Sequence, residues 1–183
     1  MHLATVSLEQ ARAHLAKPEQ LKVESERHRR TMTRLRRGER LWDHLSHLDL
    51  IYLLGGARES GQIVGPHNQH GVPWTDCSGA QLFDMRAMGL QPHNPAGWTG
   101  TLVEEGHEGT SPYFTLFLKE PEQTEGHVIG RRRHKPRVGQ DEWRWTECGG
   151  FDNPHPGGGP TWFEPTAERI AEFPYQRHFK VLS

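Results

Sequence analysis

Cys77, His127 and Glu147 are the residues of this sequence whose types suit covalent chemistry at a carbonyl group. A thiol that attacks, an imidazole that exchanges a proton with it, and a polar group that orients the imidazole are the three parts of nucleophilic catalysis by cysteine. Cys77 follows an acidic residue and precedes a small Ser-Gly pair, and His127 follows a glycine about fifty positions later. We therefore take Cys77 as the candidate nucleophile and His127 as its candidate base.

The segment after Cys77 has the apolar spacing of a short amphipathic helix. Its apolar residues are Leu82, Phe83, Met85 and Met88, and Gly89 is a favoured stop residue. Cys77 would then lie at the helix N-terminus, where unpaired N–H groups and the helix dipole favour a thiolate. A buried, inert cysteine is the alternative interpretation.

The third member of the site follows from an expected hairpin of strands 127–132 and 142–148. If its turn is centred near Arg137, Glu147 lies opposite His127, and cross-strand neighbours are close enough for a carboxylate to hold an imidazole. A slip of one residue would turn Glu147 to the other face of the sheet. His134, in the expected turn, is the alternative partner of His127.

The remaining elements form an α+β pattern of helices followed by a meander of strands. Spacing predicts a helix that starts near Ser7, a break at Gly38, and a helix from Leu41 to Tyr52. Strands are expected at 102–103, 113–118, 127–132 and 142–148, and a short helix at 165–173.

The charge distribution suggests two parts, a basic helical arm at 1–40 and a body at 41–183. The arm carries 10 Lys/Arg against 5 Asp/Glu, whereas the body carries 12 against 18. Such an arm is suited to an acidic partner, and nucleic acid is the weaker of the candidates.

The composition limits the other function classes. The 183 residues are 33% hydrophobic, and no stretch is apolar enough to span a membrane. The first ten residues lack the pattern of a secretion signal, so we expect synthesis in the cytoplasm. The two cysteines are read as thiols. A zinc site using Cys148 and a His67/His70 pair is a rival interpretation, but the main interpretation needs neither metal nor cofactor.

The motifs around the thiol resemble those of the NlpC-type cell-wall cysteine peptidases, which are papain-like domains in permuted order. The resemblance covers roughly 41–150 and rests on Asp-Cys-Ser-Gly at 76–79, Gly-His-Val at 126–128, and Tyr52 with a Gly-Gly pair at 55–56. It implies that Cys77 is the nucleophile, His127 the base, and a polar residue of the next strand the third member. The third member in that family is commonly His, whereas the candidate here is Glu147.

The resemblance also implies the reaction, which is hydrolysis of amide bonds in the stem peptides of peptidoglycan. Tyr52 matches a family position near the thiol, and we expect Trp74, Asp76 and Ser78 to take part in substrate binding with it. Trp98 is a further candidate for the groove, and Arg58 and Arg131 are candidates for meeting stem-peptide carboxylates.

A wall hydrolase without an export signal suggests a bacteriophage origin, either as a free lysin or as a virion or tail protein. The expected partners are therefore bacterial peptidoglycan and, through residues 1–40, other virion proteins. The principal rival is a non-catalytic structural protein of a phage particle that keeps a peptidase-like fold.

Overall fold

The structure is a computed structural model that describes residues 18–48, 50–54, 74–90, 98–119, 126–134, 142–149, 153, 155 and 157–180. The chain divides into two compact units, residues 1–33 and 34–183. The helix start expected near Ser7, the glycine pair at 55–56, Arg58, and the histidines at 67 and 70 lie outside the described residues. Within the described part of the chain, no helix is long and apolar enough to cross a membrane.

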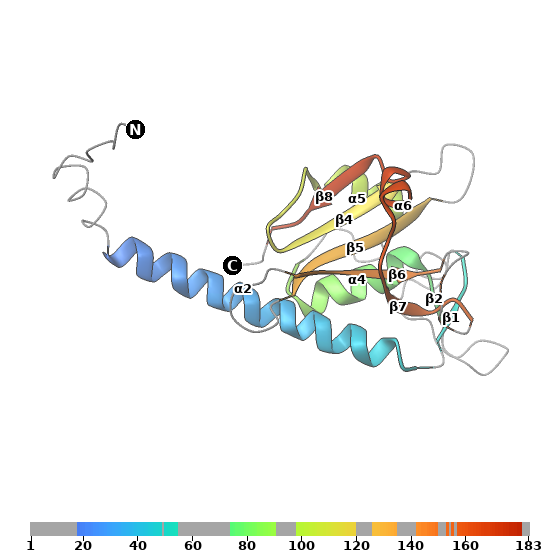
Figure 1. The fold of residues 1–183 in the computed structure, drawn as a ribbon, viewed down its shortest axis with the longest axis horizontal. Coiled ribbons are helices and arrows are strands. Elements are labelled where there is room, and N and C mark those ends of the chain that lie inside the picture. The colour runs from blue at the N-terminus through green and yellow to red at the C-terminus, as the bar shows by residue number, and fades with distance from the viewer. Residues whose placement is uncertain are drawn as a thin grey trace, which may run out of the picture. The chain divides into compact units, whose positions relative to one another are not determined.

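An antiparallel sheet of six strands is the centre of the second unit (Figure 1). Its spatial order is β3-β8-β4-β5-β6-β7, and every neighbouring pair runs antiparallel. The strands are β3 (His107–Glu108), β4 (Phe114–Lys119), β5 (His127–His134), β6 (Glu142–Cys148), β7 (Pro160–Phe163) and β8 (Tyr175–His178). With the helices described next, this arrangement confirms the α+β class.

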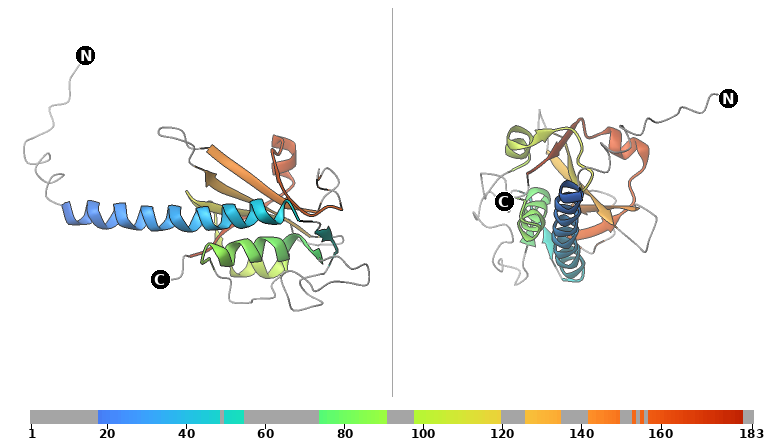
Figure 2. Two further views of the ribbon diagram at one scale, coloured as in Figure 1. Left: turned by 90° about the horizontal axis from the view of Figure 1, so that it is seen from below. Right: turned by 90° about the vertical axis from the view of Figure 1, so that its left-hand side faces the viewer.

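Four helices accompany the sheet in the described residues: α2 (Pro18–Leu45), α4 (Cys77–Ala87), α5 (Thr99–Glu105) and α6 (Ala167–Ala171). Helix α2 starts in the first unit and ends in the second. Figures 1 and 2 show α4 and α6 on opposite faces of the sheet. A separate pair of short parallel strands, β1 (Ile51–Tyr52) and β2 (Trp74–Thr75), precedes α4.

Helix α4 begins at Cys77 because Asp76 caps it. Asp76 has extended backbone geometry, and its carboxylate accepts a 2.6 Å hydrogen bond from the Gly79 N–H, as an N-cap side chain should. Gly89 follows the last turn with φ of 70°, a left-handed conformation that favours glycine. The helix predicted from Cys77 to Gly89 is therefore confirmed.

Polar contacts fix α4 to its face of the sheet. The Gln81 amide donates to both the carbonyl and the hydroxyl of Thr146 on β6, at 3.1 Å each. Further along α4, Asp84 forms an ion pair with Arg132 of β5, and both side chains are almost completely buried. Since Gln81 and Asp84 lie about one turn apart on α4 and bind two neighbouring strands, they fix its orientation as well as its position.

An apolar cluster occupies the other face of the sheet. Phe117, Ile129, Trp145 and Phe173 are all less than a tenth exposed, and Ile170 of α6 packs against them. Residues two apart on a strand share a face, so His127 lies on the same face as Ile129. The imidazole is indeed close to Phe173, with 6.0 Å between the ring centroids.

The pair Leu102–Val103 lies in helix α5, so the strand predicted there is wrong. Both side chains are buried. A short apolar run suits a buried helix as well as a strand, and periodicity alone does not separate the two.

The predicted helix boundaries near Gly38 and Tyr52 are also wrong. Helix α2 runs through Gly38 without a break and ends at Leu45. Gly38 is instead a contact point, because a Cβ there would lie 2.5 Å from the Met88 Cγ. Tyr52 lies in β1, where it pairs with Thr75 of β2.

The hairpin of β5 and β6 has a different register from the one predicted. Gly130 pairs with Thr146 and Arg131 with Trp145, so the pairing is displaced by two residues from one centred on Arg137. His134 lies in β5 rather than in the turn. A shift of two preserves the alternation of side chains, so Glu147 stays on the face that carries His127.

Candidate active site

Cys77 is the first residue of α4 and lies beside the start of β5. Its side chain is buried, and its thiol donates a long, 3.9 Å hydrogen bond to the carbonyl of Gly126, the residue before His127. The first N–H groups of a helix have no acceptor within it. The backbone N–H groups of Cys77 and Ser78 therefore point out of the helix beside the thiol.

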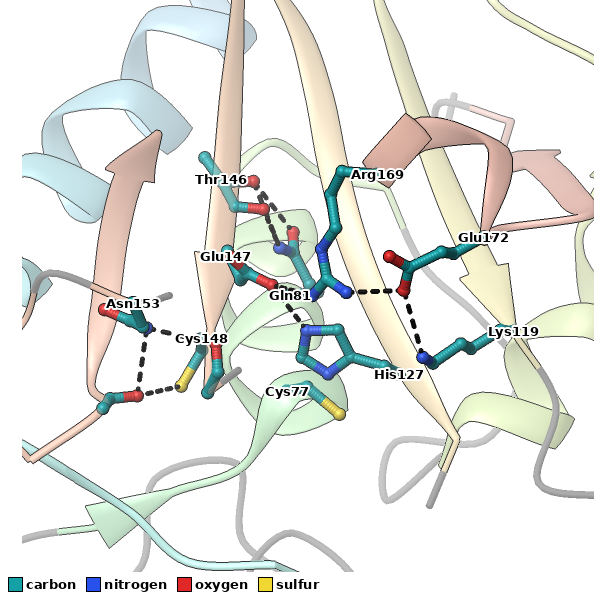
Figure 3. A network of polar contacts seen from close by, with 12 residues as sticks. Cys77, Gln81, Lys119, His127, Thr146, Glu147, Cys148, Asn153, Arg169 and Glu172 are labelled. Carbon is teal, nitrogen blue, oxygen red and sulfur yellow. Dashed lines mark hydrogen bonds and ion pairs between the residues drawn. The ribbon is translucent and has the colours of Figure 1, made fainter. Parts of the chain in front are cut away.

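His127 lies between Cys77 and Glu147 (Figure 3). Its Nε2 is 2.9 Å from the Glu147 Oε1, and in Figure 3 Cys77 lies beside the ring on the side away from that carboxylate. Both His127 and Glu147 are buried. Because Nε2 bonds to a carboxylate, it carries a proton and leaves Nδ1 for exchange with the thiol.

The electrostatic environment favours a protonated imidazole. Burial alone would lower the pKa of His127, but hydrogen bonds and charge interactions with Cys77 and Glu147 outweigh it and raise the pKa from 6.5 to about 9. Burial raises the pKa of Glu147, whereas His127 and Arg169 lower it by more. The pair is therefore an imidazolium held by a carboxylate at neutral pH.

Arg169 of α6 is a member of the site that the sequence did not indicate. Its Nη2 lies 2.7 Å from the Glu147 Oε1, the same oxygen that bonds to His127. Its Nη1 lies 2.7 Å from Glu172, which also bonds to Lys119 at 3.4 Å. Nothing in the local sequence around Arg169 marks it, since only the tertiary fold brings α6 to the end of β6.

The second cysteine differs from Cys77 in its surroundings. Cys148 is completely buried in a cluster with Trp42 and Ala80. Burial, with the nearby charges of Cys77, Asp76 and Glu147, raises the pKa of Cys148 well above its usual value. Cys148 is thus a neutral core thiol next to the site, and neither cysteine forms a disulfide.

The predicted substrate-binding residues lie around Cys77. Asp76 and Ser78 are buried and interact with each other at 3.1 Å as part of the helix cap. Tyr52 is half-buried and packs against the Trp42 and Cys148 cluster. Trp74 lies in β2, and its side chain is outside the described part of the structure.

The remaining candidates are His134, Arg131 and Trp98. His134 is at the opposite end of β5 from His127 and bonds to Glu39 of α2 at 2.6 Å, so it does not orient His127. Arg131 stacks on Trp143 with its guanidinium carbon 4.3 Å from the ring centroid. Trp98 precedes α5 and is 43% exposed.

A metal site requires several ligating side chains close together. Among the described residues, no group of three or more His, Cys, Asp or Glu side chains is arranged to hold an ion. Of the residues in the rival zinc interpretation, Cys148 is enclosed in the core, and His67 and His70 lie outside the described residues.

Comparison with family models, with curated proteins and with solved structures gives no match for this chain. The chemistry must therefore be argued from the site. A thiol at a helix N-terminus, an imidazole beside it and a carboxylate behind the imidazole are the parts required for covalent acyl transfer.

Proposed function

We propose that the protein is a cysteine peptidase that hydrolyses amide bonds in the stem peptides of peptidoglycan. The observation that carries the proposal is the contact chain from Cys77 through His127 to Glu147, with 2.9 Å between imidazole and carboxylate. The choice of peptidoglycan rests on the resemblance of the Asp-Cys-Ser-Gly and Gly-His-Val motifs to NlpC-type peptidases. We accordingly propose a permuted papain-like relationship for the α4 and sheet arrangement.

In the proposed reactive state, the proton of the Cys77 thiol lies on Nδ1 of His127, which gives a thiolate beside an imidazolium. The thiolate sulfur attacks the carbonyl carbon, and the electron pair of the C=O bond moves to the oxygen. The Cys77 backbone N–H and a neighbouring donor stabilise this oxyanion. The C–N bond then breaks as the imidazolium protonates the leaving amine, which leaves a thioester on Cys77.

Water completes the cycle. His127 accepts a proton from a water molecule that attacks the thioester carbonyl, and the sulfur leaves as the thiolate. Glu147 holds the imidazole through Nε2 during both halves. The products are a free amine and a free carboxylic acid.

Digestion of purified peptidoglycan tests the proposal. We expect new amino termini, located by mass spectrometry, after incubation with wild type and none after incubation with Cys77→Ala. Cys148→Ala is the matched control, since it removes the other thiol, and it should cleave. Equal cleavage by wild type and Cys77→Ala would assign the reaction to another group.

A second candidate function is supported by the low exposure of the site. Cys77 is 4% and His127 is 7% exposed, which also suits a structural protein of a phage particle that does not turn over substrate. Intact peptidoglycan after prolonged incubation with wild type would favour this candidate.

We further propose a phage origin, as a lysin or a virion component anchored by residues 1–40. The support is the basic charge of those residues together with the proposed wall substrate. Detection of the chain in purified particles would support the virion form, and its absence from them would leave the free lysin.

A further inference from the structure

The carboxylate of Glu147 receives two donors on one oxygen. Nε2 of His127 lies 2.9 Å and Nη2 of Arg169 lies 2.7 Å from Oε1, and the Glu147 side chain is 4% exposed. Orientation of the imidazole requires only the first of these contacts. The second comes from α6, a helix that contributes nothing else to the site.

Arg169 is fixed in place from several sides. Its Nη1 bonds to Glu172 at 2.7 Å, and its guanidinium lies 5.2 Å above the centroid of the Phe173 ring. Thr166 caps α6 by accepting a 3.1 Å hydrogen bond from the Arg169 N–H. Because backbone and side chain are both held, the guanidinium has a defined position relative to Glu147.

The shared oxygen gives Arg169 two opposite effects. Its permanent positive charge favours the ionised form of Glu147. The same charge lies close to the imidazole and disfavours a second cation there. Two donors also share the negative charge of one oxygen, so the carboxylate stabilises the imidazolium less than it would alone.

We propose that Arg169 is a positioning residue that holds Glu147 ionised and in place and limits how tightly His127 retains its proton. This inference rests on the proposed function, because His127 must release to the leaving amine the proton that it takes from Cys77. An imidazole bound to an unshared carboxylate would be a weaker acid in that step.

The groups that face His127 come from each element packed against it. They are Cys77 of α4, Glu147 on β6, Lys119 on β4, Arg169 on α6 and, through its bonds to Lys119 and Arg169, Glu172 directly after α6. Cys77 and Glu147 favour the imidazolium. Arg169 is the cation that bonds to the same Glu147 oxygen as His127. Lys119 is the cross-strand neighbour of His127, and its ammonium group bonds to Glu172.

The test is the pKa of His127, measured by NMR titration of the imidazole in the full chain. Cys77→Ala is used as the background, so that the thiol does not titrate with the imidazole, and the resonance is assigned by its loss in His127→Gln. Arg169→Met should raise the pKa of His127 by about 0.5–1 unit, because the opposing charge is removed. Arg169→Lys keeps the positive charge, so the pKa of His127 should return most of the way to its value in the chain with Arg169.

The control is Arg144→Met. Arg144 lies on the same strand as Glu147 and also bonds a carboxylate, Glu39 at 2.9 Å, but on α2 rather than at the site. This variant should leave the His127 titration unchanged. It separates the loss of a charge at the site from a general loss of packing.

Two results in Arg169→Met would overturn the inference. An unchanged pKa would make Arg169 a structural residue only, and a lowered pKa would mean that Glu147 has moved away from His127. If Arg169→Met does not fold, Glu172→Gln serves instead. It removes the anion beside Arg169 from a half-exposed position, and it should lower the His127 pKa by a few tenths of a unit.

Failure of the proposed function would be seen separately. The titration requires no substrate, so it reports on Arg169 whether or not wild type cleaves peptidoglycan. Suppose that wild type leaves peptidoglycan intact while Arg169→Met raises the pKa of His127. Arg169 would then have the proposed electrostatic effect on His127, but this effect would have no role in catalysis.

Discussion

At the scale of residues, burial favours the neutral form of both titratable groups beside Cys77, but only Cys148 stays neutral. Cys148 is buried without a counter-charge, so burial keeps it neutral. His127 is also buried, but Glu147 lies 2.9 Å away and compensates the charge of the imidazolium. The position of the Glu147 carboxylate is thus the reason that His127 is charged in the site while the Cys148 thiol stays neutral in the core.

The stability of the protein should depend on pH through His127. Its pKa is raised to about 9 in the folded chain and is about 6.5 in the unfolded chain, so the folded state binds the proton more tightly. The stabilisation is complete below pH 6.5 and is lost as the pH rises through 9. The shift corresponds to about 3 kcal/mol of unfolding free energy.

Urea denaturation at several pH values tests this prediction. The difference in unfolding free energy between wild type and His127→Gln should shrink between pH 6.5 and 9. The other histidines are common to both chains and cancel in the difference. A difference that stays constant with pH would contradict the raised pKa.

The candidate triad could be predicted from the sequence because its signals are local. The acidic residue before Cys77 and the small residues after it mark a helix start, and alternation in 142–148 gives the face of Glu147. The predicted register of the hairpin was wrong by two residues. A shift of two residues keeps each side chain on the same face of the sheet, so Glu147 still lies on the face of His127. Arg169 could not be predicted, because its contact depends on the tertiary placement of α6.

At the scale of elements, α4 is held by polar groups that a helix in an apolar core does not need. Asp84 and Arg132 form an ion pair with side chains 0% and 1% exposed. Burial raises the pKa of Asp84, and the charge of Arg132 only partly offsets this. A buried ion pair stabilises a fold little more than well-packed apolar residues would in its place. Loss of one partner is costly, because it leaves the other charge buried and unpaired.

We predict that Arg132→Met destabilises the protein strongly, by about 3–5 kcal/mol. The double variant Asp84→Leu/Arg132→Met should recover much of this loss, because no charge is then left unpaired. Chemical denaturation gives both free energies. If the loss of unfolding free energy in the double variant equals the sum of the losses in Asp84→Leu and Arg132→Met, the role of the pair in positioning α4 is contradicted.

Gly38 allows α2 to approach α4 closely. A Cβ at this position would lie 2.5 Å from the Met88 Cγ and 2.7 Å from the Asp84 Oδ1. Gly→Ala in a helix interior normally stabilises. Here we expect Gly38→Ala to lower the unfolding free energy by about 1–3 kcal/mol, because the packed core would have to shift.

The matched control for Gly38→Ala is Arg40→Ala in the same helix. Arg40 is exposed, so its replacement should change the unfolding free energy by less than about 0.5 kcal/mol. Stabilisation of the Gly38→Ala chain, measured by thermal unfolding, would show that the two helices can move apart.

Element prediction succeeded where the pattern was long and failed where it was short. The strand at 142–148 has alternating aromatic and polar residues and was predicted to the residue. Leu102–Val103 is too short a run to distinguish α5 from a strand. Strands β7 and β8 were missed. The pairing of β8 with β4 depends on segments far apart in the sequence, and β7 is only four residues long.

At the scale of the whole molecule, the second unit contains every residue of the candidate site. Residues 34–183 form one compact unit, and the last turns of α2 supply Trp42, which is fully buried and bonds to the Thr161 carbonyl at 2.9 Å. The sheet and α4 therefore have their packing partners within this range.

We predict that a chain of residues 34–183 folds without the first 33 residues. Its midpoint of thermal unfolding should lie within about 5 °C of that of the full chain, since the change removes little of the unit's core. Circular dichroism and the His127 titration measure this. Non-cooperative unfolding would show that residues 1–33 are required for the fold.

The most direct test of the central claim is capture of the thioester on Cys77 with an added nucleophile. Peptidoglycan is digested in the presence of hydroxylamine, and the products are analysed by mass spectrometry. We predict stem peptides that end in a hydroxamate from wild type and from Cys148→Ala, and none from Cys77→Ala. Cleavage that yields the same products with and without the Cys77 thiol would contradict the account.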